Sequence, residues 1–310
     1  MNIAHQLVVI FCEIDDFCKE LDEYAGHYFL SNTDQKKRRG PQPGLSVSEI
    51  MVILVMFQMV RFRDFKTFYC QYLQFLWKPY FPNLPTYHRF IELIKLAIFP
   101  LTLFIQVRSG QKTGIYYIDS TCLPVCHLKR QRQHQVFDEI AKFGKTSVGW
   151  FFGLKLHLVT NETGELIAFK ITQGNCSDSK AAESLLKSLK GLAFGDKGYL
   201  GKALFEKLFL QGLKLITRKR KNMKNATPLL NFEKQLLNQR NLIETVIDHL
   251  KHHYMVWHTR HRSILNAMTH LVAALAAYAI EPLKLSAIKS LRVLFPAACG
   301  VKWLNEQIYS

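Results

Sequence analysis

Two aspartates in the sequence stand where a protein core would normally exclude a charge. Asp119 follows four apolar or aromatic residues in "IYYID", and Asp196 ends the apolar stretch "LAFG" before the turn "DKGY". If both stretches are central strands of one sheet, the two carboxylates lie near one another where those strands emerge. A buried carboxylate without a partner is costly, so the pair requires a compensating cation. Taken singly, each aspartate also fits an ordinary turn.

A third carboxylate, Glu244, lies in "NQRNLIETVIDHLKHHY", residues 238–254, whose apolar spacing predicts one amphipathic helix. At about 100° per residue, Arg240, Glu244 and Lys251 share one stripe of this helix. The adjacent stripe is apolar and consists of Ile243, Ile247, Leu250 and Tyr254. Packing of the apolar stripe on a sheet would turn Glu244 toward the two aspartates. The alternative is a surface ion pair between Glu244 and a basic neighbour.

Three converging carboxylates indicate a metal site. They repel one another unless divalent cations lie between them, and Mg²⁺ is the usual cation where oxygen ligands meet phosphate substrates. The sequence therefore predicts that Asp119, Asp196 and Glu244 bind Mg²⁺. Asp248 is an alternative third ligand, although it lies farther from the centre of the stripe.

The elements that would position these residues form an α/β fold. "GIYYIDST", "WFFGLKLHLVT" and "ELIAFKIT" predict a three-stranded meander, in which polar Lys155 and His157 alternate with leucines. Strands and helices then alternate, which gives the order β-β-β-α-β-α-β-α. This order predicts a mixed sheet flanked by helices, and residues 238–254 supply the last of them.

Residues 1–108 are predicted to be helical. Ser46 and Glu49 have the spacing of a capping box, followed by an apolar helix that should be buried. Three short helices with a basic, aromatic third one suggest a helix-turn-helix. In such a domain Tyr87, His88 and Arg89 would reach the bases of duplex DNA in the major groove. The alternative is a packing or dimerisation domain.

The charge of the chain favours a polyanionic partner. Its 310 residues hold 41 Lys and Arg against 24 Asp and Glu, which gives a formal net charge of +17. Nucleic acid is favoured over a membrane, because the strongest apolar run, residues 271–280, is about half the length that spans a bilayer. The run "RKRKNMK" is predicted to follow a DNA backbone, with contacts from Arg218, Lys219, Arg220 and Lys221. The alternative is a solvated charge run.

Cysteine usage and the N-terminus predict a cytoplasmic protein. No secretory signal is evident, and seven scattered cysteines fit a reducing compartment. "CLPVCH" has no second Cys/His pair at the spacing of a zinc finger. Trp257 fits a core position better than a stacking platform for a flipped base.

These motifs together resemble the bacterial insertion-sequence transposases of the DDE type, which have a ribonuclease H-like catalytic core. The resemblance covers roughly residues 110–280. "YYIDST", "GDKGY" and "TQGNCSDSKA" carry it, together with the spacing of Arg240, Glu244 and Lys251. Many members have a tyrosine three residues before the arginine, and this chain has Leu237 there.

The resemblance implies a DNA transposase. Asp119, Asp196 and Glu244 would hold two Mg²⁺ ions, with Mn²⁺ as a substitute, for phosphodiester hydrolysis and then strand transfer. Arg240 and Lys251 would steer phosphates, and several copies would assemble on double-stranded DNA from the element's ends and the target. The implied domains are a DNA-binding domain over 1–108, a catalytic domain over 109–282 and a tail of unknown role over 283–310. The protein would act on the nucleoid in the bacterial cytoplasm.

Two other functions remain open at this point. A non-catalytic DNA-binding protein would share the charge and the helical N-terminus, but it has no use for three carboxylates on core elements. A structure-selective nuclease of the same superfamily would share the carboxylates but would not join strands.

Overall fold

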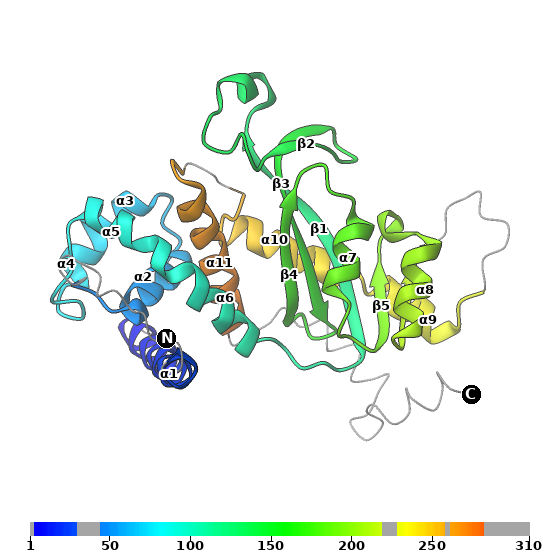
Figure 1. Cartoon of the computed structure of the whole chain (residues 1–310), viewed down its shortest axis with the longest axis horizontal. Helices are drawn as coiled ribbons and strands as arrows, with labels where there is room; N and C mark the ends of the chain where they lie inside the picture. Colours follow the sequence, from blue (N-terminus) through cyan, green and yellow to red (C-terminus); the bar gives the residue numbers. More distant parts are fainter. Residues whose placement is uncertain (1–2, 30–43, 219–227, 258–260, 282–310) are drawn as a thin grey trace. The chain divides into compact units, whose positions relative to one another are not determined.

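The computed structural model describes residues 3–29, 44–218, 228–257 and 261–281 (Figure 1). The chain divides into two compact units. Unit 1 combines the segment up to Arg108 with residues 260–280, and unit 2 runs from Ser109 to Thr259 and includes Glu281. The predicted catalytic domain extended to residue 282, whereas residues 260–280 belong to unit 1. The predicted tail, 283–310, lies outside the described residues.

Unit 1 is helical in the described ranges. Its helices are α1 (Ile3–Phe29), α2 (Val47–Met59), α3 (Phe65–Thr67), the π-helix η1 (Phe68–Leu73), α4 (Gln74–Leu76), α5 (Tyr87–Leu93), the 3₁₀ helix η2 (Ile94–Ala97), α6 (Ile98–Val107) and α11 (Ile264–Ile280). The predicted capping box of α2 is present, because Ser46 Oγ accepts from the Glu49 amide and the Glu49 carboxylate accepts from the Ser46 amide. Seven consecutive residues of α2, from Ile50 to Met56, are buried, as predicted.

The C-terminal helix α11 completes the core of unit 1. It packs against α2 and α6, and most of its side chains are buried. The helical stretch Tyr87–Val107 is the described segment that is long and apolar enough to cross a membrane by length and composition alone. A buried core helix passes the same test, and the buried Phe90, Ile94 and Leu101 place this stretch in the core of unit 1.

Unit 2 is built on a six-stranded mixed sheet (Figure 1). Its strands are β1 (Ile115–Cys126), β2 (Lys142–Lys145), β3 (Trp150–Asn161), β4 (Leu166–Gln173), β5 (Gly191–Gly195) and β6 (Leu213–Thr217). The strand order is β2-β3-β1-β5-β6, and β4 also pairs with β3. β1, β3 and β4 form the predicted antiparallel meander, and β5 and β6 continue the sheet in parallel to β1. The predicted mixed sheet flanked by helices is confirmed.

Helices cover both faces of this sheet. On one face, α7 (Asp178–Leu185) and α8 (Lys202–Leu210) pack against Tyr116 and Ile118 of β1. On the other, α9 (Asn231–Asn238) and α10 (Asn241–His252) contact β1, β5 and β6. Figure 1 shows α7 in front of the strands and α10 behind them. Because side chains alternate along a strand, β1 presents Ser120 toward α7 and Asp119 toward α10.

The structure differs from the predicted elements in two places. β2 is an additional strand, and it pairs with the first residues of β3 to form a hairpin. The predicted helix 238–254 is shorter at both ends, because α9 ends at Asn238 and α10 runs from Asn241 to His252. Arg240 is consequently the N-cap residue of α10 rather than part of a continuous stripe.

Candidate active site

Asp119 is a largely buried carboxylate in the middle of β1, and its side chain is 21% exposed. The amide of Ser120 donates to its Oδ1 at 2.8 Å, and Arg240 donates to its Oδ2 at 3.0 Å. Burial, together with the smaller effects of the negative charges of Glu244 and Asp196, raises the pKa of Asp119 to about 6, against the opposing effects of the Ser120 amide and of Arg240. Both of those carboxylates therefore lie close enough to Asp119 to act on it electrostatically.

Arg240 joins two of the three carboxylates. Its guanidinium donates to Asp119 and also to Glu244, one turn further along α10. The sequence pattern placed Arg240 on one stripe with Glu244 and Lys251, and in the structure its side chain is 9% exposed. The turn between α9 and α10 directs it inward against β1. Its Nε is buried and has no hydrogen-bond partner among the described residues.

Asp196 and Glu244 complete the group from two other elements. Asp196 directly follows β5, the parallel neighbour of β1, and it is exposed at the start of the 3₁₀ helix η4 (Lys197–Tyr199). Glu244 lies in the first turn of α10 with its side chain 47% exposed. Asp248, the alternative third ligand, is exposed one turn farther along α10.

The donor set fits a hard divalent cation. Carboxylates from two other elements act on Asp119, whose pKa is elevated chiefly because burial disfavours its charged form. In the described ranges, no three His, Cys, Asp or Glu side chains are gathered tightly enough to hold a metal. Arg240 supplies the positive charge between Asp119 and Glu244, so a cation that binds there competes with this guanidinium.

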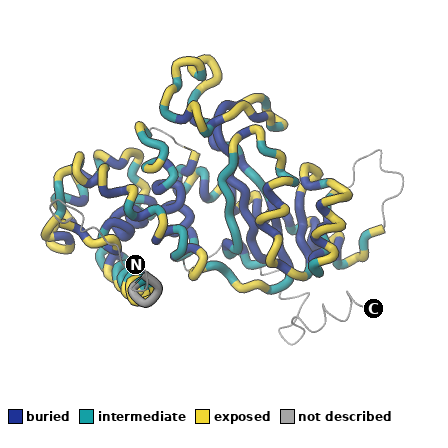
Figure 2. The backbone as a smooth tube through the Cα atoms, viewed as in Figure 1, coloured by how far each residue is buried: buried dark blue, intermediate teal, exposed yellow. Residues whose placement is uncertain are grey.

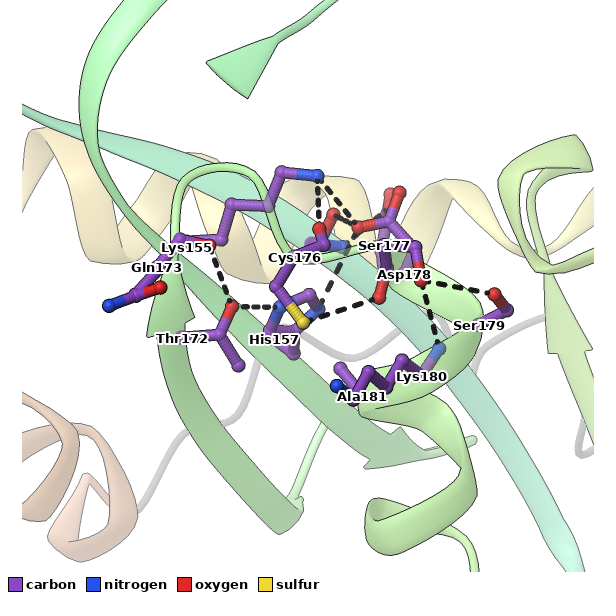
Figure 3. Close-up of polar contacts among 12 residues, drawn as sticks. Lys155, His157, Thr172, Gln173, Cys176, Ser177, Asp178, Ser179, Lys180 and Ala181 are labelled. Atoms are coloured by element: carbon purple, nitrogen blue, oxygen red, sulfur yellow. Dashed lines mark hydrogen bonds and ion pairs between the residues drawn. The ribbon is translucent and has the colours of Figure 1, made fainter. Parts of the chain in front are cut away.

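A second polar cluster lies on the opposite face of β1, around Asp178 of α7 (Figure 3). The Asp178 carboxylate accepts from Lys155 at 3.2 Å and from the hydroxyl of Ser120 at 3.0 Å. A Cβ on Gly198, in the turn after Asp196, would lie 3.1 Å from the same carboxylate. Asp178 therefore contacts the neighbours of both Asp119 and Asp196.

Lys155 and His157, the polar residues that alternate with leucines along β3, belong to this cluster. The His157 side chain is fully buried and that of Lys155 is 13% exposed, because α7 covers their face of β3. Burial lowers the pKa of His157 to about 4, so the ring is neutral near pH 7, with Nε2 2.9 Å from Thr172 Oγ1. The signal for this cluster was the stretch "TQGNCSDSKA", in which Ser177 is the N-cap of α7 and Asp178 its first residue.

The residues expected to contact DNA are spread over both units. Lys251 is half-buried on α10, and Arg218 is exposed after β6; Lys219, Arg220 and Lys221 lie outside the described residues.

In unit 1, α5 begins after Thr86, whose hydroxyl accepts from the Arg89 amide. His88 and Arg89 are exposed, Arg89 forms an ion pair with Glu92 at 2.6 Å, and the Tyr87 ring packs against Tyr69 at 5.7 Å.

Two further sequence features have clear positions. Trp257 is 45% exposed, so the core position favoured for it is wrong. Its ring meets His252 edge-on at 5.6 Å. Cys122 and Cys126 of "CLPVCH" are free thiols on β1.

Comparison with known proteins identifies the family of the chain. No curated protein matches the sequence. A cryo-EM structure of the piggyBac transposase synaptic complex with hairpin DNA contains a similar chain, with 13% identity and a TM-score of 0.48 over 98% of this chain and 84% of that one. The family model described as a transposase DDE domain matches residues 109–264, which contain all three carboxylates. The chain belongs to the family of transposases with a DDE domain.

Proposed function

We propose that the protein binds the ends of an insertion sequence, cleaves phosphodiester bonds there and joins the 3′ ends to target DNA. The observation that carries this proposal is the position of Asp196 and Glu244 within electrostatic range of the largely buried Asp119, all three inside the matched domain, with the pKa of Asp119 raised to about 6. Such a group has little use in a protein that only binds DNA, because phosphates are bound by cations and by amide dipoles.

The three carboxylates are the proposed ligands of two Mg²⁺ ions, for which Mn²⁺ can substitute. When bound, the ions would supply Lewis acidity and neutralise charge that develops on the reacting phosphate. The protein's own part is to fix the carboxylates on β1, after β5 and on α10, and to hold the DNA in place. Lys251, on the same side of α10 as Glu244, and Arg240, which contacts Glu244 from the N-cap position, are the proposed contacts to phosphates beside the cleaved bond.

The proposed partner is double-stranded DNA, from both the element's ends and the target, bound by several copies of the chain. The formal net charge of +17 supports a polyanionic partner. Tyr87, His88 and Arg89 at the start of α5 are proposed to read end sequence, and the run from Arg218 to Lys221 to follow the backbone. The proposed place of action is the nucleoid in a bacterial cytoplasm.

Single changes of the carboxylates to amides test the assignment. Asp119→Asn, Asp196→Asn and Glu244→Gln should each reduce Mg²⁺-dependent cleavage of an end duplex by about a thousandfold or more, since each removes a ligand charge. DNA binding in a gel-shift assay should remain. Asp248→Asn is the matched control on α10 and should cleave like the wild type. Retained cleavage in Glu244→Gln, or its loss in Asp248→Asn, contradicts the ligand set.

A strand-joining assay separates transposition from simple nuclease activity. Pre-cleaved end duplexes with a free 3′ hydroxyl are incubated with supercoiled plasmid and Mg²⁺, and joined products are sequenced. A transposase gives end–plasmid junctions, which Asp119→Asn abolishes. Cleavage without any junctions would indicate a nuclease.

A further inference from the structure

The hairpin formed by β2 and β3 exposes large apolar side chains, and the carboxylate chemistry does not use them. β2 pairs with β3 from Lys145–Trp150 to Lys142–Gly153, and the turn between them runs from Thr146 to Gly149. Val148 is 97% exposed and Trp150 59% exposed. Figure 2 shows the turn as an exposed projection beyond the buried part of the sheet. Exposed aromatic residues of this size usually mark a contact surface.

The exposed face of this hairpin is continuous with the face of the sheet that carries Asp119. Asp119 lies opposite Leu158 of β3, so their side chains point to the same side of the sheet. Alternation along β3 places Trp150 on that side as well, since eight residues separate it from Leu158. Phe143 and Lys145, which pair with Phe152 and Trp150, follow the same face.

The strand also sets the distance between the hairpin and the carboxylates. Eight residues of β3 at about 3.3 Å each span roughly 26 Å from Leu158 to Trp150. Duplex DNA rises about 3.4 Å per base pair, so the same length corresponds to seven or eight base pairs. A duplex that lies along this face with a phosphate at Asp119 therefore reaches the hairpin within one helical turn.

The hairpin has the charge that a DNA surface needs. Lys142 and Lys145 are both exposed, and the Lys145 ammonium lies 5.7 Å from the centre of the Trp150 ring. The 3₁₀ helix η3 (Leu128–Gln133), which contacts β3, adds three exposed basic residues, Lys129, Arg130 and Arg132. In residues 127–150 the exposed acidic residues are Asp138 and Glu139.

We propose that this hairpin is a DNA-contacting element that enters the major groove seven or eight base pairs from the cleaved phosphate. A two-stranded β-ribbon fits the major groove of B-form DNA. Lys142 and Lys145 would pair with phosphates at its rim, and Val148 and Trp150 would make the apolar contacts inside. A second copy of the chain is a less suitable occupant, because two such hairpins would bring like charges together. The inference rests on the proposed function, since it takes the duplex to be the substrate.

The test combines charge and ring variants with a control on the opposite face. Lys142→Glu with Lys145→Glu, and separately Trp150→Ala, are compared with Lys187→Glu, an exposed lysine just beyond α7. On end duplexes that extend fifteen base pairs to each side of the cleavage site, we expect KM to rise about tenfold or more for the double variant and about fivefold for Trp150→Ala. On duplexes trimmed to about five base pairs on one side of the cleavage site, the difference in KM between these variants and the wild type should become smaller. Lys187→Glu should match the wild type on both.

Methylation of guanine N7, which lies in the major groove, locates the contact. Wild-type binding should be reduced by methylation seven or eight base pairs from the cleavage site on one side, and this interference should disappear in the hairpin variants. Equal KM values for all variants, or methylation interference confined to other positions, would overturn the proposal that the hairpin contacts DNA. The proposed function would still stand if the wild type cleaves the duplex. Absence of cleavage by the wild type rejects the proposed function itself. A change in the oligomeric state of the hairpin variants without DNA would assign the surface to a second copy instead.

Discussion

The guanidinium of Arg240 lies 3.0 Å from the carboxylate of Asp119 and is also bonded to Glu244. The arginine therefore stands in for positive charge that a metal ion would otherwise supply to both acids. The contact of Arg240 with both acids should therefore affect the stability of the protein and its Mg²⁺ requirement for cleavage.

Removal of the Arg240 side chain should make stability depend on metal. In EDTA, Arg240→Ala should unfold at a lower temperature than the wild type. Its free energy of unfolding should be lower by about 1–3 kcal/mol, because two acids lose a shared hydrogen-bond donor. Added Mg²⁺ should restore part of this loss. Lys214→Ala is the control, since it breaks an ion pair with the buried Glu233 elsewhere in unit 2. The melting temperature of Lys214→Ala should respond to Mg²⁺ no more than that of the wild type. An equal response of Arg240→Ala and Lys214→Ala would contradict competition between the Arg240 guanidinium and Mg²⁺.

The elevated pKa of Asp119 predicts a pH-dependent need for Mg²⁺. Below a pKa of about 6 the carboxyl is protonated and a cation must displace the proton. The Mg²⁺ concentration for half-maximal cleavage should therefore rise about tenfold per pH unit as the pH falls below 6, and it should change little between pH 7 and 8. Magnesium titrations at pH 5, 6, 7 and 8 check this. An unchanged requirement at pH 5 would show that Asp119 is already ionised there.

The same pKa predicts the effect of Asp119→Asn on stability without metal. Burial favours the protonated acid in the folded state, so the group's favourable contribution is present below about pH 4 and is lost as the pH rises through 6. The neutral amide avoids this loss, and Asp119→Asn should be more stable than the wild type at pH 8 by up to about 3 kcal/mol. The two proteins should converge at pH 4. Denaturant titrations in EDTA at both pH values measure the difference.

Loss of the Asp178 carboxylate should disturb the active site from the far face of β1. Asp178→Asn keeps the side-chain shape but loses the charge that faces Lys155 and Ser120. We expect a lower melting temperature and a higher Mg²⁺ requirement for cleavage, because Ser120 is adjacent to Asp119. Glu183→Gln, on the same helix, removes an exposed ion pair with Lys207 and should change neither. A variant that melts early but needs no more Mg²⁺ would assign Asp178 to folding alone.

The packing side of α10 should govern stability. Ile247 is buried, and Ile247→Ala should cost about 2–5 kcal/mol through the cavity that it leaves. Thr245, an exposed neighbour, provides the matched Thr245→Ala variant, which should melt close to the wild type. Thermal melts of the two variants measure this difference in stability. Similar melting temperatures would mean that α10 does not pack through Ile247.

The sequence predicted the strands that position Asp119 and Asp196 for a simple physical reason. Asp119 interrupts an apolar run and Asp196 ends one, and such placements depend only on local residues. The burial of Arg240 and His157 was not predictable in that way. The burial of Arg240 depends on its contact with Asp119, 121 residues earlier in the chain, and that of His157 depends on α7, which lies beyond the following strand. The strand β2, "KFGK", is too short and too charged to give a clear alternating pattern.

The position of α11 in unit 1 has a consequence for the order in which the chain folds. Unit 2 is inserted between residue 108 and residue 260 of unit 1, so a ribosome completes the matched domain before α11 emerges. During that interval α2 and α6 lack the helix that covers them. A fragment that stops at residue 108 has the same exposed apolar faces and should aggregate, whereas a single chain that links residues 1–108 to 260–281 through a short glycine-serine linker should be soluble.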